Sequence, residues 1–145
     1  MKLVHLFAAL FALAIAWQGP AFAHDDADPP TAIRAVIHEM FDKPDAELVI
    51  DPVVVVDGFA VAGWTQGEMG GRAFLKEHHG HWTLVLCTGD QIRSVEALTA
   101  SGVPPETAEK LAAEIVAAEA SVDAARLAMF ASFDGIVQMD EHPKH

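Results

Sequence analysis

Apolar positions recur with a helical period in the segment that follows residue 30. They fall at i, i+3, i+4, i+7 and i+8, which places them on one stripe of a helix. These positions are Ile33, Val36, Ile37, Met40 and Phe41. Asp28 or Thr31 can cap the start of this helix, with a proline in its first turn. We expect the helix to end before Lys43-Pro44-Asp45, because proline disfavours helical backbone in the residue before it.

The pattern then changes to that of β-strands. Valine fills positions 53–56, and Asp57-Gly58, a dipeptide typical of a type I′ hairpin, separates that run from "FAVAGW" at 59–64. Leu48–Ile50 is a candidate additional strand that ends before Pro52, since proline cannot donate a ladder hydrogen bond. This region therefore predicts at least one antiparallel hairpin.

A second hairpin is predicted further along the chain. A glycine-rich loop leads to "RAFLKE" at 72–77, and "HHGH" at 78–81 separates this run from "WTLVLC" at 82–87. His79-Gly80 serves as a two-residue turn between the two runs. Together the hairpins predict an antiparallel meander of three or four strands.

The last third of the chain has a helical composition. Asp90 can cap a helix that ends near Gly102, and Pro104-Pro105 opens a second helix. A third apolar series either continues that helix or follows a kink near Ser121, and Gly135 ends it. The predicted fold class is α+β: an N-terminal helix, a three- to four-strand antiparallel meander, and two or three C-terminal helices.

The first 23 residues are typical of a secretory signal peptide. Lys2 precedes an apolar run from Leu3 to Trp17, which is too short to span a bilayer, and Ala21-Phe22-Ala23 gives the small-x-small pattern of a cleavage site. An uncleaved anchor is the alternative, but aspartates rather than a basic cluster follow the run. We expect cleavage after Ala23 and a periplasmic location.

The mature chain is long enough for one domain. About 120 residues support a single core, so we expect a polar segment at 24–30, one α+β domain at 31–135 and a polar tail at 136–145. The net charge of −12 disfavours nucleic acid and anionic membranes as partners and favours cations. Membrane contact is expected only through a partner protein. The single cysteine, Cys87, excludes an intramolecular disulfide.

The predicted second hairpin brings two histidines together. With His79-Gly80 as the turn, His78 and His81 are directly opposed, with Cβ atoms about 4.5–5.5 Å apart. Two imidazoles at that separation can chelate one transition-metal ion. The alternative is that polar residues gather at a hairpin tip because they are solvated there.

The same register places Cys87 opposite Arg72 and Val85 opposite Phe74. A guanidinium beside the thiol would favour the thiolate and make it more reactive or a better ligand for a soft metal. The alternative is a small buried cysteine that fills a gap in the core. A thiol-based activity at Cys87 is therefore one hypothesis to test.

The C-terminal tail offers a further set of metal ligands. Met139, His142 and His145 combine a thioether with imidazoles, which suits copper as Cu(I) or Cu(II). The alternative is a solvated terminus without fixed geometry.

Long stretches of the chain resemble the small exported bacterial family of copper uptake system-associated proteins. The resemblance rests on residues 42–90, with "WTQGEMGGRA" and "LCTGD", on "ASGVPPETAEKLAAEI" at 100–115, and on a Val-x-Met segment before a histidine-bearing tail. It implies association with copper transport and handling in the periplasm. Our leading hypothesis is a non-enzymatic protein that binds or passes copper, with a copper ion and a copper transport protein as expected partners.

Copper gives the expected cleavage site a chemical meaning. Cleavage after Ala23 would free the α-amino nitrogen of His24, which together with its imidazole can chelate Cu(II). Candidate copper ligands are therefore His24, His78, His81, Met139, His142 and His145. The alternative function is an interaction module that docks on a transporter without itself binding metal.

Overall fold

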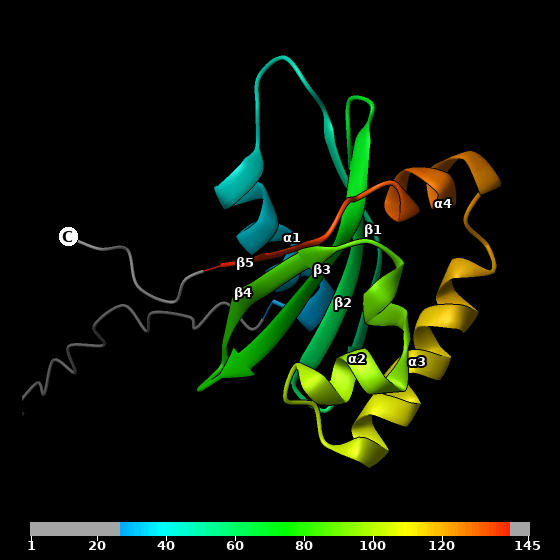
Figure 1. Cartoon of the computed structure of the whole chain (residues 1–145). Coiled ribbons are helices and arrows are strands. Elements are labelled where there is room, and N and C mark those ends of the chain that lie inside the picture. The colour runs from blue at the N-terminus through cyan, green and yellow to red at the C-terminus, as the bar shows by residue number, and fades with distance from the viewer. Residues whose placement is uncertain (1–26, 140–145) are drawn as a thin grey trace, which may run out of the picture.

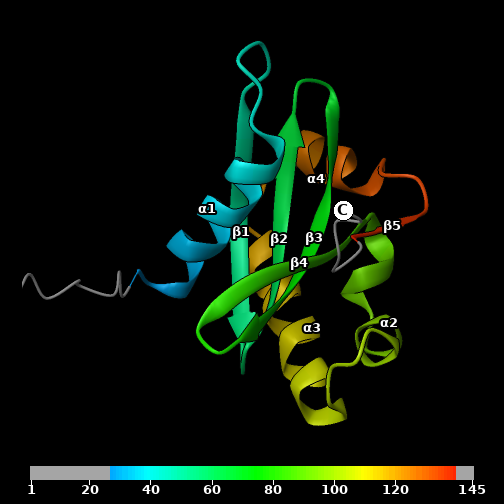
Figure 2. The same cartoon turned by 90° about the vertical axis from the view of Figure 1, so that its left-hand side faces the viewer.

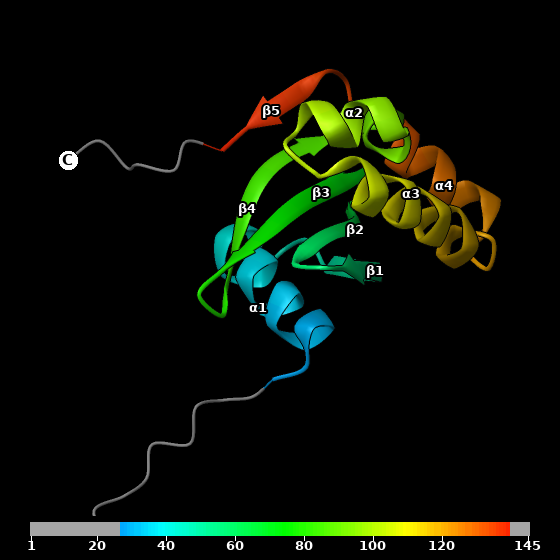
Figure 3. The same ribbon diagram turned by 90° about the horizontal axis from the view of Figure 1, so that it is seen from below.

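The structure is a computed structural model that describes residues 27–139. A five-stranded antiparallel sheet lies between one helix and a group of three (Figure 1). Figure 2 looks onto the sheet from the side of the first helix, α1, and Figure 3 shows from below that α1 and the pair α3 and α4 lie on opposite sides of the sheet. The predicted α+β class is confirmed.

The first helix, α1, spans Pro29–Phe41. Its N-cap is Asp28, whose carboxylate accepts hydrogen bonds from the backbone N–H of Thr31 at 3.3 Å and from its hydroxyl at 2.7 Å. Ile33 and Ile37 are buried against the sheet. The predicted helix, its cap and its end before Pro44 are confirmed.

The sheet has the order β1-β2-β3-β4-β5. Its first four strands are β1 (Leu48–Val56), β2 (Phe59–Gln66), β3 (Met69–His78) and β4 (His81–Thr88). Asp57 and Gly58 both have positive φ, as a type I′ turn requires, and so do His79 and Gly80. Both predicted hairpins are confirmed.

Two features of the sheet differ from the predicted meander. Leu48–Ile50 is not a separate strand but the first part of β1, whose pairing with β2 is interrupted between Ile50 and Val53, around Pro52. A fifth strand, β5 (Ile136–Gln138), pairs with the end of β4. It lies in the segment that the sequence analysis assigned to the polar tail.

The C-terminal helices follow the prediction with two adjustments. Asp90 begins a 3₁₀ turn, η1 (Asp90–Arg93), and it is Ser94 whose side chain caps α2 (Val95–Ala100). Helix α3 spans Pro105–Glu119, and α4 (Ala124–Ala131) is a separate helix with its own cap at Asp123. The third apolar series therefore does not continue α3 past Ser121 but forms a separate helix.

Each face of the sheet carries its own core. Side chains of α1 and of one sheet face form the first core, whose buried members include Ile33, Ile37, Leu48, Ala73, Leu75, Leu84 and Cys87. The second core joins the other face to α2 and α3, and its buried members include Val61, Phe74, Leu86, Leu98, Leu111 and Ile115. Within residues 27–139, none of the helices has both the length and the apolar character needed to cross a membrane.

Candidate functional site

The tip of the β3–β4 hairpin carries the predicted histidine pair. His78 and His81 are direct partners in the β3–β4 ladder, and both are exposed. The predicted opposition of these residues is therefore confirmed, because the two-residue turn sets the register next to it. In the part of the chain that the structure describes, no group of three His, Cys, Asp or Glu side chains lies close enough to hold a metal ion. The pair therefore offers two ligands.

The other candidate ligands are placed differently. His24, His142 and His145 lie outside the described residues. Met139 follows β5, and its backbone N–H donates a hydrogen bond to the carbonyl oxygen of Val85 at 2.8 Å. Its side chain is partly buried and packs against the core on the α1 side of the sheet. The structure thus places Met139 on the folded domain and apart from the hairpin tip.

A cavity of about 240 Å³ opens beside Met139 on the α1 face of the sheet. Three sulfur-bearing side chains from separate strands or strand ends line it: Met69, Cys87 and Met139. The rest of its wall is mainly apolar and includes Ile37, Phe41, Leu48, Trp64, Phe133 and Val137. Of the described residues in this wall, Lys43 alone carries a charge.

Cys87 reaches this cavity because the β3–β4 register shifts. Leu75 pairs with Leu84 but Phe74 pairs with Leu86, so Val85 is an extra residue in β4. Cys87 is therefore opposite Ala73, and Arg72 is opposite Thr88. Since neighbouring strand positions face opposite sides of a sheet, the one-residue shift moves Cys87 to the α1 face and away from the Arg72 guanidinium. The predicted Cys87–Arg72 pairing is wrong.

The surroundings of Cys87 favour the protonated thiol. Burial raises its pKa to about 11, and the nearby indole N–H of Trp64 opposes this with a smaller effect. The Trp64 Nε1 atom is buried and has no hydrogen-bond partner among residues 27–139. The indole N–H is therefore close to the sulfur without forming a well-aligned hydrogen bond. A thiol with a raised pKa is a poor nucleophile at neutral pH, which disfavours the hypothesis of a thiol-based activity.

The raised pKa predicts a loss of stability at alkaline pH. Between about pH 9 and pH 11 the unfolded chain releases the Cys87 proton while the folded chain retains it, so the free energy of unfolding falls as the pH rises. The full effect is about 2–3 kcal/mol. Urea denaturation of the natural chain and of Cys87→Ala at both pH values measures it. The difference in the free energy of unfolding between the natural chain and Cys87→Ala should shrink or reverse at pH 11. A difference that stays constant between the two pH values would contradict the raised pKa.

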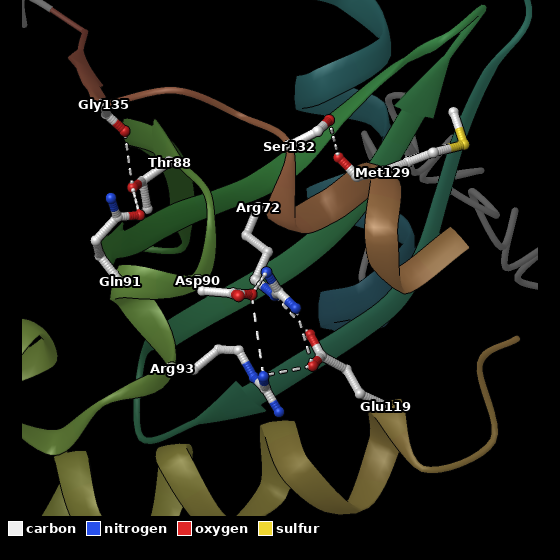
Figure 4. A network of polar contacts seen from close by, with 9 residues as sticks. All are labelled: Arg72, Thr88, Asp90, Gln91, Arg93, Glu119, Met129, Ser132 and Gly135. Carbon is white, nitrogen blue, oxygen red and sulfur yellow. Dashed lines mark hydrogen bonds and ion pairs between the residues drawn. The ribbon is translucent and has the colours of Figure 1, made fainter. Parts of the chain in front are cut away.

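A cluster of charged side chains lies on the face of the sheet opposite the cavity (Figure 4). The buried guanidinium of Arg72 donates to both carboxylate oxygens of Glu119, at 2.6 and 3.1 Å, and to Oδ1 of Asp90 at 2.9 Å. The Nε atom of Arg93 lies 3.1 Å from Oε2 of Glu119, an ion-pair distance without hydrogen-bond alignment. The two guanidinium groups balance the two carboxylates in charge, and we interpret the cluster as structural. An arginine within a largely apolar strand was the signal in the sequence.

No protein-family model matches the chain, and the comparisons with curated proteins and with solved structures likewise gave no match. The family resemblance therefore stays a prediction, and the case for function depends on the residues themselves.

Proposed function

We propose that this is an exported, non-enzymatic protein that handles copper. The observation that carries the proposal is the cross-strand pairing of His78 and His81 at an exposed hairpin tip. Two imidazoles presented from neighbouring strands form a chelate for Cu(II), and an exposed tip allows an ion to arrive and to be passed on. The resemblance of residues 42–90 to copper uptake system-associated proteins supports the same function.

The flanking segments add ligands of the same kind. His24 would supply an amino-terminal chelate after signal cleavage, and His142 and His145 would supply imidazoles beyond Met139. The acidic net charge of −12 favours cation capture and transfer to a copper transport protein. Intact mass and N-terminal sequencing of the exported protein test the cleavage, with His24 as the expected first residue.

Copper binding at the hairpin is tested by titrating the exported protein with Cu(II) in competition with free histidine. We expect the double variant His78→Ala and His81→Ala to lose one equivalent of bound Cu(II). His79→Asn is the matched control, because His79 sits at a positive φ that asparagine tolerates and is not in the cross-strand pair. If the protein retains neither Cu(II) against free histidine nor Cu(I) against a Cu(I) chelator, the proposed function is wrong.

A second candidate function is docking onto another exported protein. Strand β5 is a short edge strand, and two of its side chains, Ile136 and Val137, are 56% and 47% exposed. An unpaired apolar edge can accept a strand from a partner. If docking is the function, a transporter should be bound equally well after all exposed histidines are replaced. If copper handling is the function, the same replacement should abolish copper-dependent transfer.

A further inference from the structure

We propose that the cavity between α1, the sheet and β5 is a Cu(I) site in which Cys87, Met69 and Met139 supply sulfur ligands. This inference rests on the proposed copper handling, but it assigns a different set of residues and one oxidation state.

The composition of the wall supports this choice of metal. Thiolate and thioether sulfurs are the ligands that select Cu(I) over harder ions. Cys87 lies in β4, Met69 begins β3 and Met139 follows β5, yet all three line the same cavity. The cavity measures about 240 Å³, against roughly 30 Å³ for one water molecule in the liquid, so an ion and the methionine ends that approach it have room.

Charge balance favours a monovalent ion. One Cys87 thiolate with two neutral thioethers neutralises Cu(I), whereas a divalent ion would leave a net positive charge in an apolar cavity. Lys43, the charged residue of the described wall, is exposed and can keep its ammonium in solvent. The cavity should therefore discriminate against Cu(II) and Zn(II) by charge as well as by ligand type.

Trp64 provides an independent observation. Its Nε1 donor is buried without a partner in the described part of the chain, and it lies close to the Cys87 sulfur. A buried donor without an acceptor is energetically unfavourable, because it has lost its hydrogen bonds to water. A metal-bound thiolate is a far better acceptor than a thiol, so metal binding would give this N–H its missing acceptor and orient the ligand.

Met69 provides a route for the ion from solvent, and the end of β5 positions Met139. Met69 is 57% exposed and its side chain is unbranched, so it can carry an ion from solvent to the buried sulfur. Met139 is held at the cavity by the hydrogen bond from its backbone to Val85. The arrangement is therefore one buried cysteine sulfur, one positioned thioether and one exposed thioether at the mouth.

The binding reaction exchanges a proton for the metal. Cu(I) forms a bond with the Cys87 sulfur, and the thiol proton goes to solvent, without any change in oxidation state. One proton released per Cu(I) is the signature of this site.

The test is an anaerobic Cu(I) titration of the exported protein against a chromophoric Cu(I) chelator, with His78 and His81 replaced by alanine to remove the hairpin site. We expect Cys87→Ser to weaken binding by at least about 100-fold and Trp64→Phe by about tenfold, as outer-shell partners do. Met139→Leu, which keeps the apolar packing, should weaken binding without unfolding the domain. Met40→Leu is the matched control, since Met40 is exposed on α1 and does not line the cavity.

Two results would overturn the cavity site. One is equal Cu(I) affinity in Met139→Leu, Cys87→Ser and Met40→Leu; the other is binding without proton release. If either occurs while Cu(II) is still lost on replacing His78 and His81, the cavity inference fails and the proposed function stands. If the natural protein retains neither Cu(I) nor Cu(II), both fail.

Discussion

Replacing Arg72 with alanine is expected to lower the free energy of unfolding by about 3–5 kcal/mol. The Arg72 side chain is 1% exposed and donates to Glu119 and to Asp90 (Figure 4). Within residues 27–139, its removal leaves the buried Glu119 carboxylate with the partly exposed Arg93 as its one cationic partner. A buried charge that loses its partner costs far more than the intact pair contributes. Urea denaturation followed by circular dichroism measures the loss.

Two further variants separate charge from packing. Replacing Arg72 and Glu119 together with methionine should recover most of the loss, because two apolar side chains leave no buried charge. Lys110→Ala, an exposed position on the same helix as Glu119, is the control and should change stability by less than about 0.5 kcal/mol. The loss of stability in the double variant is compared with the losses in Arg72→Met and Glu119→Met. If the loss in the double variant equals the sum of the two single losses, the pair does not act as a unit.

Local rules explain which parts of the fold the sequence could predict. Helix α1 begins at an aspartate cap and ends before a proline, and the hairpins turn at Asp57-Gly58 and His79-Gly80, where positive φ is tolerated. Each signal involves residues a few positions apart. The opposition of His78 and His81 was predictable for the same reason, since it depends only on the turn beside them.

Positions farther from a turn could not be predicted in the same way. The extra residue Val85 shifts the β3–β4 register, and nothing in the sequence of β4 alone requires that shift. Counting back from the turn therefore placed Cys87 beside Arg72 instead of in the cavity wall. Strand β5 was missed because three residues gain strand structure only by pairing with the end of β4, a contact about 50 residues distant in sequence.

The cavity itself is a product of these non-local contacts. Met69 appeared in the sequence only as part of a glycine-rich loop, Cys87 as a possible reactive thiol and Met139 as part of a polar tail. Their convergence depends on the bulge, on β5 and on the packing of α1 together. Composition indicated that ligands for copper were present, while the fold decides which of them share a site.

Replacing Phe130 with alanine is the second change expected to have a large effect, about 3–5 kcal/mol of lost stability. Phe130 is fully buried on α4, and the Arg72 and Arg126 guanidinium carbons lie 5.3 and 5.2 Å from its ring centroid. Its ring also lies where a side chain at Gly63 would be: a Cβ there would come within 2.5 Å of Phe130 Cζ. The ring thus joins α4 to β2 and β3.

This contact predicts a specific coupling between Gly63 and Phe130. Alone, Gly63→Ala should cost about 1–3 kcal/mol, because the added methyl overlaps the ring in a well-packed core. In the Phe130→Ala background the same methyl enters the space that the ring has left, so its cost should fall to near zero. A double-mutant cycle by urea denaturation gives the coupling energy, and costs that add would mean that α4 settles onto the sheet and fills the space that the ring has left. Since Phe130 also packs against Arg72, closure of α4 over the sheet and the buried ion pair are expected to stabilise one another.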